Sequence, residues 1–286
     1  MNSTTINKET LMAIARLAIN EDVGPGDHSS LAAVPATARK EAMIIAKEAG
    51  VIAGIEMATA IFQLVDADLV LEIIKNDGGE VAAGDEVLRV SGKAQSILTA
   101  ERTVLNVMQR MSGIATYTRK LVTMVAGTNA RILDTRKTTP GLRVLEKWAV
   151  RLGGGTNHRF GLFDMIMLKD NHIDYAGSIT SAIAATKNYL RENNLNLKIE
   201  VETRSLQEVK EVLESGGADI IMLDNMTPET MTEAIKIIDG RLQVEASGGI
   251  TEKNLREIAE CGVDYISIGA LTHSVMSLDI SLKAIK

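Results

Sequence analysis

The sequence is poor in cysteine, lacks long apolar runs and carries fewer basic than acidic residues. Its single cysteine, Cys261, cannot form a disulfide within the chain, so a reducing compartment fits best. Nowhere do about 18 uncharged apolar residues follow one another, which excludes a membrane-spanning helix. The first residues contain an early acidic side chain and no apolar stretch, unlike a secretory signal. We therefore expect a soluble, cytoplasmic protein.

The shortage of positive charge argues against general nucleic-acid binding. The chain has 31 Lys and Arg against 37 Asp and Glu, a net charge of −6. Between residues 131 and 172, however, eight cations and four anions give a local +4. These cations are Arg131, Arg136, Lys137, Arg143, Lys147, Arg151, Arg159 and Lys169. Such an island suits a small anionic ligand, although one well-charged helix over Leu142–Leu152 explains it equally well.

The N-terminal part has the pattern of a mixed α+β segment. Helical spacing from Ser3 to Asn20 is broken by Gly24-Pro25-Gly26, and a helix is expected over Ile55–Val65. Short β-type runs at 42–54, 69–79 and 85–92 predict mostly antiparallel strands. A long amphipathic helix follows from Ser96, with an interruption expected near Ser112-Gly113.

The rest of the chain alternates short apolar runs with helical patterns, which predicts a parallel sheet. The runs are apolar throughout, as in strands buried on both faces. They cover Arg131–Leu133, Met165–Leu168, Lys198–Val201, Asp219–Leu223, Leu242–Ala246 and Asp264–Ile268. Six such units favour a complete or partial barrel over a doubly wound open sheet.

Each apolar run ends in a residue suited to chemistry, which is the main reason for preferring a barrel. The carboxyl ends of barrel strands converge on one face, where active sites lie. An open sheet would spread these residues along a line instead. They are Asp134, Lys169, Glu202, Asp224, Ser247 and Gly269.

Several cations lie beside these strand ends. Arg136 and Lys137 follow a buried strand, where adjacent cations need a compensating anion. Thr139 and Pro140 are explained as a helix start, with Thr as its cap. Arg suits bidentate carboxylate or phosphate binding, and Lys supplies a point charge. The glycines at 153–155 could be a phosphate cradle or simply a helix stop.

The acidic residues form a second group. Glu200 and Glu202 are two apart and share one strand face, and Asp224 ends the next strand. They could pair with Lys169 or Arg136, or bind Mg²⁺, which prefers oxygen ligands. Glycine-rich strand ends at Ala246–Ile250 and Ser267–Thr272 let backbone amides approach a phosphate. Together these groups predict a phosphorylated sugar and an anionic partner as ligands.

These motifs, in this order and over nearly the whole chain, resemble the quinolinate phosphoribosyltransferase family. DTRKTTPG and the block HRxGLxDxxxxKDNH are the most specific of them. The resemblance implies an N-terminal α/β sandwich domain joined to an incomplete α/β barrel. We assign residues 1–108 to the first and 109–272 to the catalytic barrel, with the segment 273–286 packing on the first domain.

The resemblance also implies an activity. The family transfers phosphoribose from phosphoribosyl pyrophosphate to quinolinate with decarboxylation, giving nicotinate mononucleotide, pyrophosphate and carbon dioxide in NAD biosynthesis. The expected cofactor is Mg²⁺, with no organic cofactor. The expected assembly is a homodimer, or a higher oligomer, in which one subunit completes its neighbour's site.

Matching residues imply the following roles. Glu202, Asp224 and Lys137 are catalytic, and the two acids also face Mg²⁺, partly through substrate and water. Arg102 reaches the partner's site. Quinolinate carboxylates are held by Arg136, His158, Arg159 and Lys169, and phosphates by Lys137, Thr138, Ser247, Gly248, Gly249, Gly269 and Ala270.

Three other interpretations stay open. A paralogue of the family could act on a different anionic acceptor. Lys169 at a strand end could form a Schiff base in an aldolase, which requires a desolvated lysine. A non-catalytic sensor would bind the same anions without releasing pyrophosphate.

Overall fold

The computed structural model describes residues 6–285, which form two compact units. Within the described residues, unit 1 takes in the chain up to Arg119, Thr139–Gly154 and the chain from Leu271 onward. Unit 2 takes in Lys120–Thr138 and Gly155–Ala270. No helix in the described part of the chain is both long and apolar enough to cross a membrane.

Unit 1 contains the predicted antiparallel strands. The sheet order is β12-β1-β5-β3, with β1 (Arg39–Ala46), β3 (Val70–Ile73), β5 (Glu86–Lys93) and β12 (Ile280–Ala284). A separate antiparallel pair joins β2 (Gly50–Val51) to β4 (Glu80–Val81). Ala42, Ile44 and Ala46 alternate with more exposed positions on β1, so one face of the strand is buried. The pairing of β12 with β1 brings the C-terminal segment onto the N-terminal sheet.

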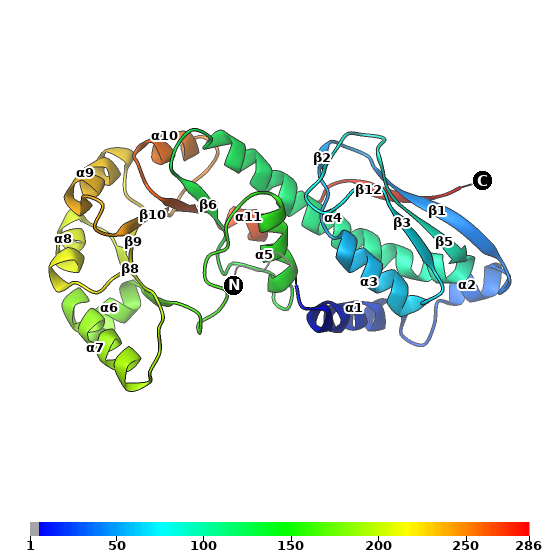
Figure 1. Ribbon diagram of the computed structural model, residues 1–286, viewed down its shortest axis with the longest axis horizontal. Coiled ribbons are helices and arrows are strands. Elements are labelled where there is room, and N and C mark those ends of the chain that lie inside the picture. Colours follow the sequence, from blue (N-terminus) through cyan, green and yellow to red (C-terminus); the bar gives the residue numbers. More distant parts are fainter. Residues whose placement is uncertain (1–5, 286) are drawn as a thin grey trace. The chain divides into compact units, whose positions relative to one another are not determined.

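The helices of unit 1 include one unusually long element. They are α1 (Lys8–Val23), α2 (His28–Ala33), α3 (Ile55–Val65), α4 (Ala94–Met124, continuing into unit 2) and α5 (Arg143–Leu152) (Figure 1). The helix expected from Ser3 starts at Lys8, where the Asn7 side chain caps it, and residues 3–5 lie outside the described part. The helix over Ile55–Val65 has the predicted bounds. The boundary expected after residue 108 falls inside α4.

The predicted interruption of α4 near Ser112-Gly113 is wrong, because α4 runs on for 31 residues. The Ser112 hydroxyl accepts a hydrogen bond from Ala53 N at 2.9 Å and donates one to Ala53 O at 3.2 Å. A Cβ on Gly113 would collide with the carbonyl oxygen of Met276. The two small residues therefore allow close packing and do not end the helix.

The predicted helix start at Thr139-Pro140 is also wrong. Helix α5 begins at Arg143 after a turn, and its N-cap residue Leu142 makes no side-chain capping bond. Thr139 instead accepts a hydrogen bond from Arg110 Nη2 at 2.7 Å, and its amide donates to Glu146 at 3.1 Å. Tertiary partners have thus replaced the local capping role.

Unit 2 is built on the predicted parallel sheet. The six strands have the order β6-β11-β10-β9-β8-β7. Their bounds are β6 (Arg131–Leu133), β7 (Ile166–Leu168), β8 (Ile199–Thr203), β9 (Ile220–Asp224), β10 (Gln243–Ser247) and β11 (Tyr265–Ser267). Most of their buried positions are apolar as expected, but Glu200, Glu202 and Glu245 are buried within β8 and β10. All six apolar runs contain a strand.

Helices cover the outside of this sheet in sequence order (Figure 1). They are α6 (Asp170–Ala176), α7 (Ile179–Glu192), α8 (Leu206–Ser215), α9 (Pro228–Ile238) and α10 (Leu255–Glu260), and α11 (Ala270–His273) follows β11. Among the described residues no pairing joins β6 to β7, the two edges. The parallel α/β architecture is confirmed, and closure into a barrel stays a prediction.

Candidate active site

The strand-end residues of unit 2 lie along one edge of the sheet. Ser247 at the end of β10 is in register with Asp224 at the end of β9. Glu202, near the end of β8, is in register with Met222 on β9. The parallel order of the strands therefore gathers Glu202, Asp224 and Ser247 at the carboxyl edge, as the sequence predicts.

The cations after β6 lie in a tight loop. The Lys137 amide donates to Thr135 Oγ1 at 3.0 Å, and the Thr138 amide donates to the Arg136 carbonyl at 2.9 Å. Lys137 is exposed, whereas Arg136 and Thr138 are half-buried. This loop presents two positive charges directly beside the end of a buried strand.

Arg159 lies close enough to Arg136 for the two charges to repel. Burial, followed by this repulsion, lowers the pKa of the Arg159 guanidinium. Its Nη1 donates to Met165 O at 3.4 Å, while its Nε is buried without a hydrogen-bond partner among the described residues. A buried donor beside a second cation is suited to an anionic ligand, which would satisfy the donor and relieve the repulsion.

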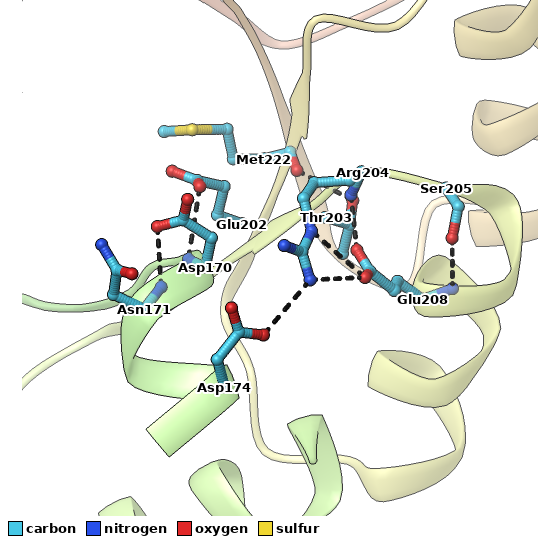
Figure 2. A network of polar contacts seen from close by, with 9 residues as sticks. All are labelled: Asp170, Asn171, Asp174, Glu202, Thr203, Arg204, Ser205, Glu208 and Met222. Carbon is cyan, nitrogen blue, oxygen red and sulfur yellow. Dashed lines mark hydrogen bonds and ion pairs between the residues drawn. The ribbon is translucent and has the colours of Figure 1, made fainter. Parts of the chain in front are cut away.

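Lys169 and Glu202 form the ion pair considered from the sequence. Lys169 Nζ lies 3.2 Å from Glu202 Oε2, and the Glu202 side chain is almost fully buried. Figure 2 shows the Glu202 carboxylate beside the start of α6, where Oε1 accepts from Asp170 N at 3.4 Å. The Lys169 side chain is 47% exposed. That exposure does not provide the desolvation that a Schiff-base lysine needs.

Further contacts fix the end of β8 (Figure 2). Thr203 donates to Met222 O at 2.9 Å, across to β9. Arg204 Nη2 contacts Glu208 on α8 at 3.0 Å and Asp174 on α6 at 3.7 Å. The strand that carries Glu202 is therefore held on both sides.

The glycine loop after β10 packs tightly against the end of β9. Asn225 adopts a positive φ of 54°, donates from its amide to Ser247 O at 2.9 Å and donates from Nδ2 to Asp224 Oδ2 at 2.7 Å. A Cβ on Gly248, which has φ +88°, would collide with the Asn225 side chain. Glycine is thus required at 248, and its lack of a side chain leaves backbone amides accessible to a ligand.

The glycines at 153–155 are explained without a phosphate. Gly153 caps α5 by donating to Ala149 O at 3.0 Å, and a Cβ there would collide with the Ala115 carbonyl on α4. Of the two alternatives, the structure supports the helix stop.

A buried cluster lies deeper in unit 2. His158 Nε2 is 3.1 Å from Glu200 Oε2 and 3.2 Å from Glu245 Oε2, and both acids are fully buried. The Arg159 amide donates to His158 Nδ1 at 2.6 Å, and the His158 amide donates to Asp134 Oδ1 at 2.8 Å. One side-chain atom from each of His158, Glu200 and Glu245 lies within 4.8 Å of the others, a grouping that could hold a metal ion.

The geometry of this cluster indicates which of its atoms carry protons. Burial, opposed by His158 and reinforced by Glu245, raises the pKa of Glu200 to about 7. Burial lowers the pKa of His158 and the two carboxylates raise it, but the resulting value of about 10 requires that Nδ1 can take a second proton. An imidazolium would need a proton on Nδ1, which faces the Arg159 amide hydrogen. The contact therefore favours a neutral ring protonated on Nε2, beside a Glu200 carboxyl whose pKa is raised.

The sequence interpretation missed Glu245 entirely and left the role of Glu200 open. Both have the same signal: each lies two residues before a strand-end site residue, Glu202 or Ser247, and so points to the same face. Arg102 is exposed on α4 in unit 1. The individual roles given to the site residues stay predictions.

Comparison with known proteins decides the family. Residues 27–112 match the N-terminal domain of quinolinate phosphoribosyl transferase, and residues 114–283 match its C-terminal domain. The chain belongs to the quinolinate phosphoribosyl transferase family. The predicted family is therefore confirmed, together with its two-part fold.

Relatives with curated names support this membership over almost the full length. A rice protein named nicotinate-nucleotide pyrophosphorylase (carboxylating), chloroplastic, is 50% identical over 96% of this chain and 77% of its own. A probable enzyme of the same name from Synechocystis is 46% identical, over 93% of this chain and 90% of its own. The crystal structure of NadC from Streptococcus pyogenes matches with a TM-score of 0.94 and 40% identity, covering 99% of this chain and 100% of that one.

Proposed function

We propose that this family member transfers the phosphoribosyl group of phosphoribosyl pyrophosphate to quinolinate and decarboxylates the product. The products are nicotinate mononucleotide, pyrophosphate and carbon dioxide, a step of NAD biosynthesis. The observation that carries the proposal is the buried, unpartnered Arg159 Nε beside the like-charged Arg136. An anion bound beside Arg159 would satisfy the buried Nε and offset the repulsion, and quinolinate brings two carboxylates.

The carboxylates of quinolinate would bind Arg136, Arg159 and Lys169. Guanidinium groups can bind a carboxylate through two parallel hydrogen bonds, which fixes the ring as well as the charge. Phosphate oxygens would bind Lys137, Thr138 and the loops at 247–249 and 269–270. The Gly248 conformation and the absence of a Cβ there support a close backbone approach.

The ribosyl transfer needs little covalent chemistry from the protein. The pyridine nitrogen bonds to C1 of the ribose while the bond from C1 to pyrophosphate breaks, and pyrophosphate leaves with that electron pair. The oxocarbenium-like transition state is positively charged, and the carboxylates of Glu202 and Asp224 would stabilise it. Lys137 would stabilise the negative charge that develops on the departing pyrophosphate.

Decarboxylation then follows from the positive ring nitrogen. The bond between the adjacent ring carbon and its carboxylate breaks, carbon dioxide leaves, and the electron pair stays on that carbon. The carbon takes up a proton from water. The protein contributes mainly by positioning the dianion, so no organic cofactor is required.

Magnesium fits the acidic residues at the strand ends. Glu202 and Asp224 provide carboxylate oxygens, the donors that Mg²⁺ prefers, and they would hold it partly through substrate and water. The ion would neutralise pyrophosphate charge when bound. The His158 cluster, with a protonated Nε2, does not offer the all-oxygen donors typical of Mg²⁺.

We further propose a homodimer in which Arg102 enters the partner subunit's site, since Arg102 is exposed on α4. The dimer is the assembly expected from the family resemblance.

A cytoplasmic location is proposed on the basis of the single free thiol of Cys261.

The proposed reaction is tested by incubating the protein with phosphoribosyl pyrophosphate, Mg²⁺ and quinolinate while pyrophosphate and carbon dioxide are followed together. We expect equal release of both with quinolinate and neither with nicotinate, which lacks the second carboxylate. Release of pyrophosphate with a different acid alone would favour a paralogous acceptor. Ligand binding without any pyrophosphate would favour a sensor.

A further inference from the structure

We infer that His158, Glu200 and Glu245 form a positioning cluster that fixes the backbone of Arg159 and so aims its guanidinium at a quinolinate carboxylate. In this arrangement both ring nitrogens of His158 contact the protein, so the ring acts through Arg159 and not by touching the substrate. The inference rests on the proposed function for the identity of that substrate.

The two buried acids of this cluster, Glu200 and Glu245, need an explanation. Glu200 and Glu245 are both fully buried, and the reaction described above uses neither of them. Buried carboxylates are costly unless they meet partners. Their contacts with His158 Nε2, at 3.1 and 3.2 Å, come from two different strands, β8 and β10. The ring is therefore held between two rigid elements of the sheet.

The Nδ1 side of the His158 ring contacts the backbone that the cluster holds in place. His158 Nδ1 accepts the Arg159 amide hydrogen at 2.6 Å, and Asp134, just after β6, accepts the His158 amide hydrogen at 2.8 Å. Residues 157–165 contain neither helix nor strand. These contacts tie the irregular segment to three strands at the point where Arg159 begins.

The same contact argues against a metal ion at the cluster. A neutral imidazole carries one proton and offers one lone pair. Because Nδ1 faces an N–H, its lone pair is used there and the proton lies on Nε2. A protonated Nε2 has no lone pair for a metal, although the three side chains lie close enough for one. Polar contacts at 3.1 and 3.2 Å, although not aligned as hydrogen bonds, therefore account for the cluster without a metal ion.

The kinetic test compares Glu245→Met with Glu245→Gln. The methionine removes the polar contact at similar length, whereas the glutamine amide oxygen can still accept from Nε2. We expect Glu245→Met to raise the KM for quinolinate about tenfold and leave that for phosphoribosyl pyrophosphate within about twofold. Glu245→Gln should restore both values. Glu200→Met and Glu200→Gln should behave in the same way.

Asp264→Leu is the matched control for loss of structure alone. Asp264 Oδ2 accepts from Val244 N at 2.8 Å, on the residue of β10 that directly precedes Glu245. Its loss should lower stability without separating the two KM values. Equal changes in both KM values for Glu245→Met, or no change in either, would contradict the positioning role.

A second measurement does not depend on turnover. Long-range ¹H–¹⁵N spectra of the histidine-labelled wild-type protein report which ring nitrogen is protonated, and His158→Asn assigns the signal among the four histidines. We expect the proton on Nε2, and no stoichiometric metal by elemental analysis. A proton on Nδ1, or one bound metal per chain with no rescue by glutamine, would overturn the cluster. If the wild-type protein did not convert quinolinate, the proposed function would fail. A proton on Nε2 would then still support the positioning of Arg159 by the cluster, but not its role in binding quinolinate.

Discussion

Lys169 is a residue whose importance to binding and to stability can be separated. Its side chain is 47% exposed and pairs with Glu202 at 3.2 Å. An exposed ion pair contributes only about 0–1 kcal/mol, but the loss of Lys169 would leave the buried Glu202 carboxylate unpaired and would cost somewhat more. A cation that binds a substrate carboxylate contributes far more to turnover, because it orients the charge at the reacting centre.

We therefore expect Lys169→Ala to lower kcat/KM for quinolinate by about 100-fold and the free energy of unfolding by about 1–3 kcal/mol. Steady-state kinetics and chemical unfolding measure the two quantities. Lys120→Ala is the matched control, since Lys120 forms an exposed ion pair with Glu252 at 2.6 Å in the same unit. Near-normal turnover by the Lys169 variant would remove it from the carboxylate site.

At the residue scale the sequence predicts the edge of the site better than its interior. Glu202 could be recognised because it ends an apolar strand and precedes a turn. Glu245 shares a strand face with Ser247, but its role could not be recognised, because it depends on His158 and Glu200 from distant parts of the chain. Strand register brings the three together, and register is not visible in any one strand's pattern.

At the scale of elements, Gly113 sets how closely the C-terminal segment approaches α4. A Cβ at this position would collide with Met276 O and lie 3.0 Å from Ser277 Cα. The segment continues directly into β12, which pairs with β1 from Ala42 to Ala46. The glycine thus connects helix packing to the edge of the sheet.

Gly113→Ala has two opposite effects on the free energy of unfolding. In a free helix this change stabilises by about 1 kcal/mol, because alanine is the better helix former. Here we expect a loss of about 1–3 kcal/mol, since the added methyl must push backbone aside. Hydrogen exchange should be faster in β12 than in the wild type. Asn106→Ala, an exposed position of the same helix, is the control. A more stable Gly113→Ala protein would contradict the close approach.

The element scale also explains which sequence predictions failed. Strand positions were predictable because the buried parallel strands are mostly apolar, with the buried glutamates of β8 and β10 as exceptions. Ser112-Gly113 and Thr139-Pro140 were misread because local propensity was outweighed by tertiary partners. The start of α3 is a further case: Asp77, distant in sequence, accepts from the amides of Gly54 at 2.5 Å and Ile55 at 3.0 Å. Nothing next to Ile55 in the sequence indicates such a cap.

At the scale of the whole molecule, the chain returns to unit 1 twice after leaving it. Thr139–Gly154 and the chain from Leu271 belong to unit 1, while the segments between them belong to unit 2. The sequence favours packing of the C-terminal segment with the first domain because of the family resemblance. Nothing in the sequence indicates that residues 139–154 belong to unit 1, because α5 has the pattern of an ordinary amphipathic helix.

The proposed sharing of sites between subunits predicts recovery of activity from two inactive variants. Arg102→Ala would remove the residue supplied to the neighbour, and Lys169→Ala would remove one from the chain's own site. After dissociation and random reassociation, half of the dimers contain both variants, and each such dimer has one intact site. About a quarter of wild-type turnover should therefore return.

The measurement is the turnover of quinolinate before and after the two purified variants are mixed under mild denaturant and returned to buffer. Each variant treated alone is the control, and light scattering follows the dimer. Mixing Lys169→Ala with Arg136→Ala should restore nothing, because both changes lie in the same unit and leave every site defective. If the Arg102 mixture also stayed inactive while mixed dimers formed, each chain would have to complete its own site. Recovery above about a quarter would indicate preferential pairing of unlike chains, since random pairing sets that limit.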